Sequence, residues 1–372
     1  MQEPDIPIEG EERIAYLTLA LTPGVNASRL RNLIQKCITP SGALTAPLAF
    51  LETVPEMKAT VAQSVHDAKM ELGHRVMDDL ARVGGQLLLP GDPVFPRVLF
   101  TVEPAPTYLF AMGRIELLAR PAVAIVGSRD HTRYGAEVCE AIAGGAAAAG
   151  VVVVSGMARG LDAVAHHAAL AAGGGSIGVL GCGLGVIYPE SNRMLYSLMR
   201  TDGLLLTEAP PGERPKKGSF PKRNRIIAGL ARATVVVEAA VGSGALITAN
   251  EALDQGKDVL AVPGGVTSPT SVGTNRLLRD GAAPLLDLED LLSRYPEVNL
   301  LADATDPDAS TPSGAVIAML KAGPRQADEI AATLRFPTGQ VLALLGIMEI
   351  QGLVVQRPGL TYSLPRARFA AG

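Results

Sequence analysis

The middle of the chain alternates short apolar runs with segments of helical periodicity. Runs rich in valine, isoleucine and leucine predict strands near 122–127, 151–155, 177–181, 204–208, 234–238 and 258–262. The segments between them predict helices near 135–149, 160–172, 191–200, 223–231 and 244–255. Strands that are apolar throughout are typical of parallel sheets covered on both faces by right-handed crossovers. We therefore predict an α/β fold with an extended Rossmann-like parallel sheet over 85–300, where the proline-rich segment 85–121 is an extended lead-in.

Helical patterns flank this body on both sides. Residues 11–84 read as a helical domain, and Thr22-Pro23-Gly24-Val25 breaks it into a helix hairpin that is either a plain connector or a contact for DNA backbone. An acidic linker is predicted at 301–312. Residues 313–366 read as three short helices and a β-hairpin, the outline of a winged helix. Because its second and third helices carry little positive charge, a protein-contact role stands beside DNA binding.

Composition narrows the class of protein. The 372 residues carry a net charge of −4, so any polyanion site must be a local concentration of positive charge. Three isolated cysteines have neither disulfide nor metal-ligand spacing, and we expect no metal or cofactor. The acidic N-terminus lacks the features of a secretion signal, and no apolar run is long enough to span a bilayer. These features predict a cytoplasmic protein with no membrane contact.

Glycine-rich turns follow the first two predicted strands. Ligands of parallel sheets bind at the carboxyl ends of the strands, where glycine exposes backbone N–H groups to anions. The sequences Gly127-Ser128-Arg129 and Ser155–Gly160 therefore predict a phosphate cradle. Its candidate residues are Gly127, Ser128, Arg129, Ser155, Gly156, Arg159 and Gly160. Asp162 follows at the start of a helix, where it can cap the helix and bond His166.

A basic segment with one aromatic residue comes later in the chain. Phe220 precedes Pro221, Lys222, Arg223, Asn224 and Arg225. An aromatic ring beside cations can stack an unpaired base while the cations hold its phosphates. The turn after the fifth strand adds candidates on the same rim, namely Glu238, Ser243, Gly244 and Thr248. No Walker sequence occurs, which disfavours a nucleotide-hydrolysing motor.

Six segments together resemble the DNA processing protein A (DprA or Smf) family. They are GSR at 127–129, SGMARGLDAVAHHAAL at 155–170, VLGCGLGVIYPESN at 179–192, FPKRNRIIAGL at 220–230, VVEAAVGSGALITA at 236–249 and AVPGGVTSPTSVGTN at 261–275. The resemblance implies a Rossmann-like domain preceded by a sterile-alpha-motif-like domain and followed by a winged helix. It also implies a homodimeric, non-catalytic protein that binds and protects single-stranded DNA in natural transformation and loads the RecA recombinase, alongside other DNA-processing proteins. Arg129, Lys222, Arg223 and Arg225 would line the DNA pocket, and Phe220 would stack a base.

Two alternatives remain open. Pro263-Gly264-Gly265 with Gly273-Thr274 loosely resembles the loop of nucleotide-hydrolysing enzymes of the lysine-decarboxylase-like (LOG) group, although its spacing differs and no glutamate follows closely. The basic segment could also serve an acidic protein partner. The preferred hypothesis is a single-stranded-DNA-binding protein that is not an enzyme.

Overall fold

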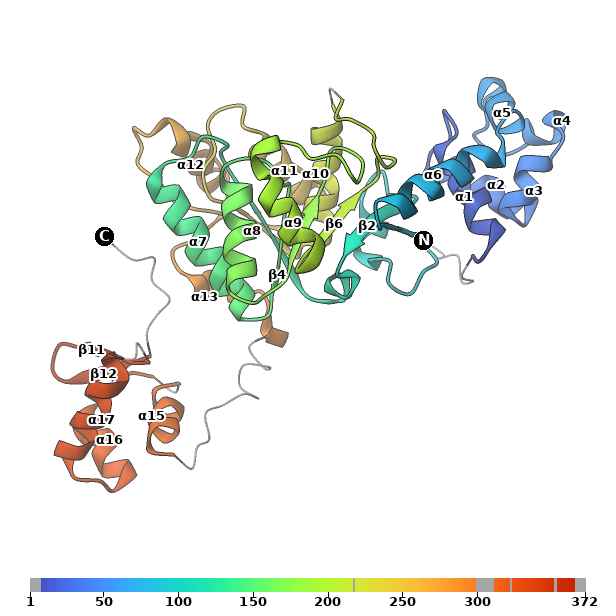
Figure 1. Cartoon of the computed structure of the whole chain (residues 1–372). Helices are drawn as coiled ribbons and strands as arrows, with labels where there is room; N and C mark the ends of the chain where they lie inside the picture. Colours follow the sequence, from blue (N-terminus) through green and yellow to red (C-terminus); the bar gives the residue numbers. More distant parts are fainter. Residues whose placement is uncertain (1–7, 217, 299–310, 322, 351–352, 365–372) are drawn as a thin grey trace. The chain divides into compact units, whose positions relative to one another are not determined.

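The chain forms two compact units that divide after Leu285. We describe a computed structural model of residues 8–216, 218–298, 311–321, 323–350 and 353–364 (Figure 1). The first unit contains the N-terminal helices and a nine-stranded sheet. The second contains the C-terminal helices and a three-stranded sheet. Each unit is described by itself.

Short amphipathic helices make up the N-terminal region. They are α1 (Glu11–Leu21), α2 (Ala27–Cys37), α3 (Pro40–Thr45), α4 (Leu48–Leu51), α5 (Ala59–His66) and α6 (Met70–Arg82). The predicted hairpin joins α1 to α2, and Asn26 caps α2 by accepting the N–H of Arg29. Gly24 has φ +85°, and a side chain there would approach Val61 within 2.8 Å, so the turn requires glycine. A DNA contact at this hairpin stays a prediction.

The central sheet is mostly parallel. Its strands are β1 (Gln86–Leu88), β2 (Leu109–Gly113), β3 (Ala122–Val126), β4 (Val152–Ser155), β5 (Ser176–Val179), β6 (Leu204–Thr207), β7 (Ala233–Val236), β8 (Asp258–Ala261) and β9 (Ala283–Pro284). The strand order is β1-β2-β6-β5-β4-β3-β7-β8-β9. Strands β3 to β8 correspond to the six predicted strands and run parallel, which confirms the predicted fold class.

The segment 85–121 differs from the extended lead-in that the sequence predicts. It supplies β1 and β2, and β2 pairs antiparallel to β6, a strand about a hundred residues later in the chain. It also contains two 3₁₀ helices, η1 (Arg97–Thr101) and η2 (Ile115–Ala119). The prolines of this segment lie between these short elements, so they interrupt a helix without preventing strand pairing.

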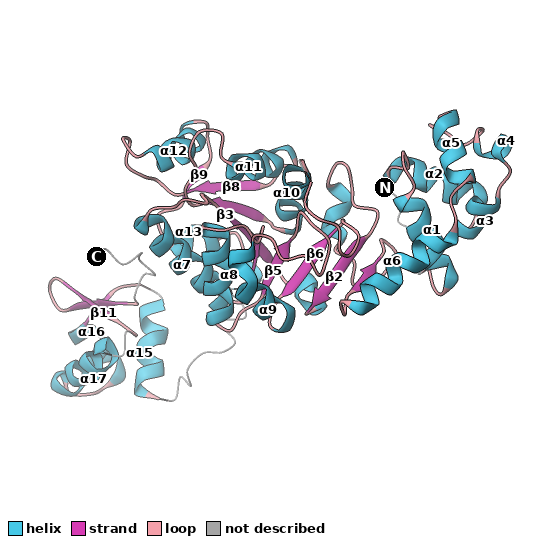
Figure 2. Cartoon of the chain, turned by 45° about the horizontal axis from the view of Figure 1, so that its top comes forward, coloured by secondary structure: helices cyan, strands magenta, loops and turns pink. Residues whose placement is uncertain are grey.

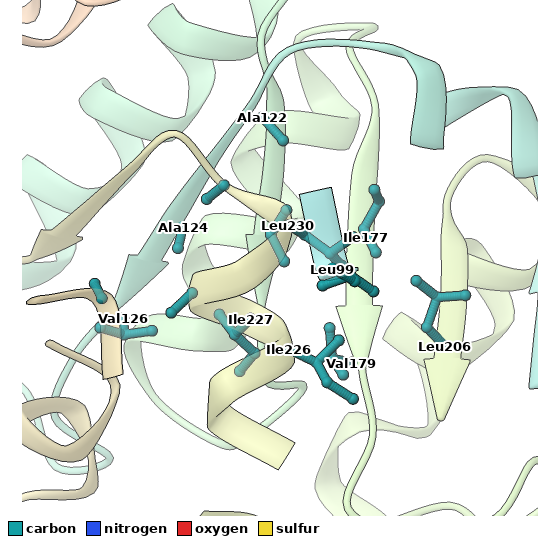
Figure 3. Packing of buried hydrophobic residues seen from close by; sticks show 14 of the residues in the cluster. Leu99, Ala122, Ala124, Val126, Ile177, Val179, Leu206, Ile226, Ile227 and Leu230 are labelled. Carbon is teal, nitrogen blue, oxygen red and sulfur yellow. The ribbon is translucent and has the colours of Figure 1, made fainter. Parts of the chain in front are cut away.

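Helices cover both faces of the sheet (Figure 2). The flanking elements are α7 (Arg133–Ala148), α8 (Leu161–Ala171), η3 (Glu190–Asn192), α9 (Arg193–Thr201), α10 (Ser219–Leu230), α11 (Gly244–Asp254), η4 (Pro269–Ser271) and α12 (Val272–Arg279). Right-handed crossovers place α7, α8 and α9 on one face, and α10 and α11 on the other. In Figure 3, Ile226 and Leu230 of α10 lie over Val179 and Ile177 of the sheet. Each such buried side chain contributes about 1.5–3 kcal/mol.

Helix α10 begins earlier than the sequence predicts, at Ser219 instead of near residue 223. Phe220, Pro221 and Lys222 therefore occupy its first turn, where proline is tolerated because it lacks only an unneeded N–H. At the other end, the Nζ atom of Lys257 donates to the carbonyl oxygens of Ala228, Gly229 and Ala231. This ammonium group supplies a donor to the carbonyls at the end of the helix.

The second unit contains the predicted three helices and hairpin. They are α15 (Pro312–Lys321), α16 (Ala327–Leu334), α17 (Thr338–Ile350), β11 (Val355–Arg357) and β12 (Thr361–Ser363), with α13 (Leu288–Leu292) preceding them. A further short strand, β10 (Arg325–Gln326), pairs with β12. Most of the predicted linker 301–312 lies outside the described residues. In the described part of the chain no single helix is long and apolar enough to cross a membrane, and only the bent pair of α16 with α17 passes on length and composition.

Replacing Lys257 with methionine should destabilise the first unit. The carbonyls at the end of α10 lose a charged donor, and a hydrogen bond to a charged group contributes about 1.5–3 kcal/mol. We expect the free energy of unfolding in urea to fall by roughly that amount. The matched control Lys58→Met changes an exposed lysine in the N-terminal helices and should leave the unfolding midpoint in place. Equal midpoints for the two variants would contradict the capping role.

Candidate nucleic-acid interface

A cavity of about 490 Å³ opens at the carboxyl ends of β3 and β7. These strands are neighbours in the sheet, and the chain leaves them toward helices on opposite faces. Such a switch point in an open parallel sheet is the expected place for a ligand. The cavity is lined by Val126, Gly127, Ser128, Arg129, Ala158, Asp162, Phe220, Pro221, Arg223, Asn224, Ile227, Ala240, Val241, Gly242, Ser243, Gly244, Ala245, Ile247 and Thr248.

The first predicted turn lies directly on this cavity. Gly127 is glycine because a Cβ atom would come within 2.4 Å of Leu161 at the start of α8. The Ser128 hydroxyl is engaged locally, since it donates to the carbonyl of Asp130 and accepts the N–H of the same residue. Arg129 is exposed, and its side chain has no partner among the described residues. Its guanidinium group is therefore available to a phosphate.

The second predicted turn, Ser155–Gly160, packs against the first turn and is mostly buried. Ser155 is fully buried and donates to the carbonyl of Ile125 at 2.6 Å, so the phosphate contact predicted for it does not fit its position. The backbone of Gly156 is likewise enclosed. Gly160 has φ +81°, and a side chain there would collide with the carbonyl of Ser128. Arg159 is exposed but pairs with Asp130 and does not line the cavity.

The basic segment divides into buried and exposed cations. Arg223 is only 7% exposed, and its Nη1 atom donates to the carbonyls of Gly156 and Val179. Arg225 is 4% exposed and pairs with Glu208 at 2.7 Å. The prediction that both arginines present their charge to phosphates is thus not supported, because α10 carries them into the interior. Lys222 remains exposed on the first turn, between two residues that line the cavity.

The side chains of Asp162 and Arg223 both pack against Gly156. Burial raises the pKa of Asp162, whereas the charge of Arg223 and the N–H groups of Gly156 and Ala158 oppose that rise. Burial lowers the pKa of Arg223, and Asp162 opposes that change. Each of the two groups therefore stabilises the charged form of the other inside the protein.

His166 does not bond Asp162, contrary to expectation. Its Nδ1 atom lies 2.7 Å from the Ser176 hydroxyl, and its Nε2 atom accepts the N–H of Met157. Burial lowers the pKa of His166 to about 3, so the ring is neutral at pH 7. This histidine joins α8 to the strands beneath it.

Two aromatic rings stand at the edge of the cavity. The centroids of Phe220 and Tyr188 are 5.4 Å apart, and their planes are tilted by 31°. Gly181 makes room for Phe220, because a Cβ atom there would lie 2.6 Å from the ring. Tyr188 is 45% exposed and was missed by the sequence reasoning, since its contact with Phe220 is not local. The pair presents an aromatic surface larger than the predicted single ring.

The turn after β7 opens helix α11 toward the cavity. Ser243 caps this helix by accepting the N–H of Ala245. Gly244 is exposed, and its carbonyl accepts from the side chain of Asn224. Val241 and Ile247, which the sequence reasoning did not select, add apolar surface to the cavity wall. The helix N-terminus gives this wall a positive end.

Glu238 lies away from the cavity and is 2% exposed. Its carboxylate accepts the N–H and hydroxyl of Thr132 and the hydroxyl of Thr270. The predicted contact of Glu238 with a sugar, base or arginine is therefore replaced by a structural role. It fixes the start of α7, where Thr132 is the cap.

The segment 263–274, which suggested a hydrolase, forms hydrogen bonds within itself and with Asn275. Thr274 is 1% exposed and donates to the carbonyl of Ser271. The Asn275 side chain bonds both the N–H and the carbonyl of Gly264. None of these residues lines the cavity. The geometry thus offers nothing specific in favour of the hydrolase alternative.

Comparison with known proteins agrees with this arrangement. Residues 86–296 match the family described as DNA recombination-mediator protein A, and residues 301–359 match the DprA winged helix domain. The chain belongs to the DprA family. DprA of Streptococcus pneumoniae is 43% identical over 204 residues, covering 55% of this chain and 72% of that protein. DprA of Bacillus subtilis is 36% identical over 262 residues, covering 70% and 88%.

Two experimental DprA structures are also similar. The X-ray structure of the Streptococcus pneumoniae protein superposes with a TM-score of 0.64 at 32% identity, covering 77% of this chain and 98% of that one. The Helicobacter pylori structure, described for its single-stranded DNA binding mode, has a TM-score of 0.52 at 29% identity and covers 59% and 96%. DprA membership thus rests on both sequence and fold.

Replacing Gly156 with alanine should destabilise the interface. The new Cβ atom would lie 2.7 Å from both Arg223 Nη2 and Asp162 Oδ2, which must move apart. Overpacking of this kind costs roughly 1–3 kcal/mol of unfolding free energy, measurable by urea titration. Gly144→Ala is the matched control, because its Cβ would meet nothing closer than 3.8 Å. If Gly156→Ala were as stable as the control, the close packing of these two side chains against Gly156 would be refuted.

Proposed function

We propose that this protein binds single-stranded DNA and serves DNA processing in natural transformation. The observation that carries the proposal is the cavity at the sheet's switch point, which brings Arg129, Phe220 and the N-terminus of α11 together. The Helicobacter pylori relative, described for single-stranded DNA binding, supports the same assignment for this chain.

The exposed groups divide the work between phosphate and base. Arg129 and Lys222 hold phosphates, assisted by backbone N–H groups at the start of α11. Phe220 and Tyr188 stack a base, which needs no particular sequence because every base has a flat face. The buried Arg223 and Arg225 build the site without meeting the backbone of the DNA.

We extend the proposal to the biological role that family membership favours. The protein protects incoming single strands and loads RecA onto them, acting by binding and not by catalysis. It works as a homodimer in the cytoplasm, alongside other DNA-processing proteins. These statements rest on membership in the DprA family and assign no residue of this chain to RecA or to a second copy.

Arg129→Ala and Lys222→Ala should each weaken binding to a fluorescent oligothymidylate. The expected loss is roughly fivefold at low salt, because each variant removes one exposed cation from a phosphate. The slope of log affinity against log salt should fall in magnitude by about 0.7 for each cation removed from the DNA backbone. Fluorescence anisotropy across a salt series measures both effects.

Arg114→Ala is the control for this experiment. Arg114 follows β2, which runs antiparallel to β6. It therefore lies at the end of the sheet where the parallel strands begin, and the cavity lies at the other end. Its side chain is 42% exposed and pairs with Glu116. Losses of equal size in all three variants would show that general charge, and not this interface, binds the DNA.

Phe220→Ala should lower single-strand affinity by about 5- to 150-fold, since stacking contributes roughly 1–3 kcal/mol per base. Its salt slope should stay at the wild-type value because no cation is removed. Phe50→Ala, at an exposed phenylalanine of α4, is the matched control. An unchanged affinity for Phe220→Ala would rule out the stacking role.

A further inference from the structure

The three-residue turn Gly156–Ala158 has an uncommon backbone conformation. Met157 has φ +55°, the left-handed region that a residue other than glycine adopts only where its surroundings enforce it. Met157 is also 1% exposed, and Gly156 is buried beside it. Water does not reach these backbone groups, so the turn depends on partners from the rest of the protein.

Helix α8 binds all three N–H groups of this turn. The N–H groups of Gly156 and Ala158 donate to the carboxylate of Asp162. The N–H of Met157 donates to the Nε2 atom of His166. Both acceptor side chains belong to α8, which therefore fixes the turn from one side.

Two other segments bind the three carbonyl groups of the turn. The Nη1 atom of Arg223, on α10, donates to the carbonyl of Gly156 at 2.7 Å. The Nδ2 atom of Asn192, on η3, donates to the carbonyls of Met157 and Ala158, each at 3.1 Å. Asn192 is 8% exposed, and these bonds use both of its amide hydrogens. The turn therefore joins α10 to η3.

Each of these two segments also carries one ring of the aromatic pair. Phe220 precedes Arg223 by about one turn of α10. Tyr188 precedes Asn192 by four residues, and its carbonyl accepts from the Tyr196 hydroxyl at 3.3 Å. The two ring centroids are 5.4 Å apart. The aromatic pair is thus formed by two segments that are bound to the same three carbonyl groups.

We propose that Asn192 is a positioning residue that sets the distance between the rings of Tyr188 and Phe220 through the turn Gly156–Ala158. The inference rests on the proposed function and deepens it, because it identifies what holds the stacking surface in shape. Loss of the Asn192 amide releases the segment that carries Tyr188, while Arg223 still holds α10 in place. The rings then separate, and a base loses part of the surface on which it stacks.

Fluorescence of the free protein tests the ring distance without DNA. The chain contains no tryptophan, so Tyr188→Trp introduces a single indole ring that reports on its contact with Phe220. Adding Asn192→Ala should shift the emission maximum to longer wavelength, because the indole ring moves into water. Asn192→Ser keeps one donor and should give a smaller shift. An emission maximum that neither variant changes would overturn the inference, whether or not the protein binds DNA.

A double-mutant cycle tests the consequence for binding, with a fluorescent oligothymidylate as the probe. Tyr188→Ala and Asn192→Ala should each weaken binding about fivefold, the lower end of one stacking contact. Because Asn192 acts through Tyr188, the double variant should lose little more than either single variant, instead of the roughly 25-fold product expected of independent sites. The salt slope should not change, since no cation is removed. Losses that multiply would indicate a general structural role and overturn the inference.

Asn32→Ala is the matched control for Asn192→Ala. The Asn32 amide also donates to a backbone carbonyl, that of Pro55, but it lies in the N-terminal helices. This variant should leave the emission maximum and the affinity unchanged, and equal losses in the two asparagine variants would overturn the inference. Urea unfolding midpoints check that every variant is folded. Wild type that does not bind the oligothymidylate would defeat the proposed function, whereas the emission of the free protein would still decide the role of Asn192.

Discussion

The buried guanidinium group of Arg223 is the interaction on which the rest of the interface depends. It bonds the carbonyls at the ends of β4 and β5 and holds the Asn224 amide in place. A cation removed from water must be paired, and Asp162 supplies the opposite charge. These bonds orient the first turns of α10. Phe220 therefore lines the cavity, with Lys222 exposed close by, because Arg223 anchors the helix that carries them.

The pattern of apolar runs predicted the parallel part of the sheet well. Strands β3 to β8 are almost entirely buried, so their sequences are mostly apolar and easily recognised. Strands β1 and β2 escaped prediction because they lie in a proline-rich segment and β2 pairs with β6, which is remote in sequence. The first turn of α10 escaped because Pro221 reads as a helix breaker, although a proline near the start of a helix is harmless.

The sequence predicted the location of the candidate site more successfully than the residues that face its cavity. The cavity lies where three glycine-rich turns suggested, but charge alone did not show which cations face outward. Helix α10 buries Arg223 and Arg225, and the carboxylates of Asp162 and Glu208 that compensate their charges are brought near by the fold. Glycine had a similar ambiguity. The absence of a side chain at Gly127 and Gly156 makes room for side chains of the protein itself, whereas the sequence reasoning expected a phosphate in that space. Thr248 was selected from its position on the rim, and the structure places it in the cavity lining.

The N-terminal helices share one hydrophobic cluster with the edge of the sheet. Leu17 and Leu80 belong to the same buried group as Leu87, Phe110 and Leu184. The Arg13 side chain crosses the junction to Asp92 and the carbonyl of Leu87. A gene fragment begun at the start of β1 would thus encode a sheet whose edge has lost its apolar cover. Such a truncated product would aggregate through that bare edge, so the helical region is a part of the folding unit that cannot be trimmed without harm.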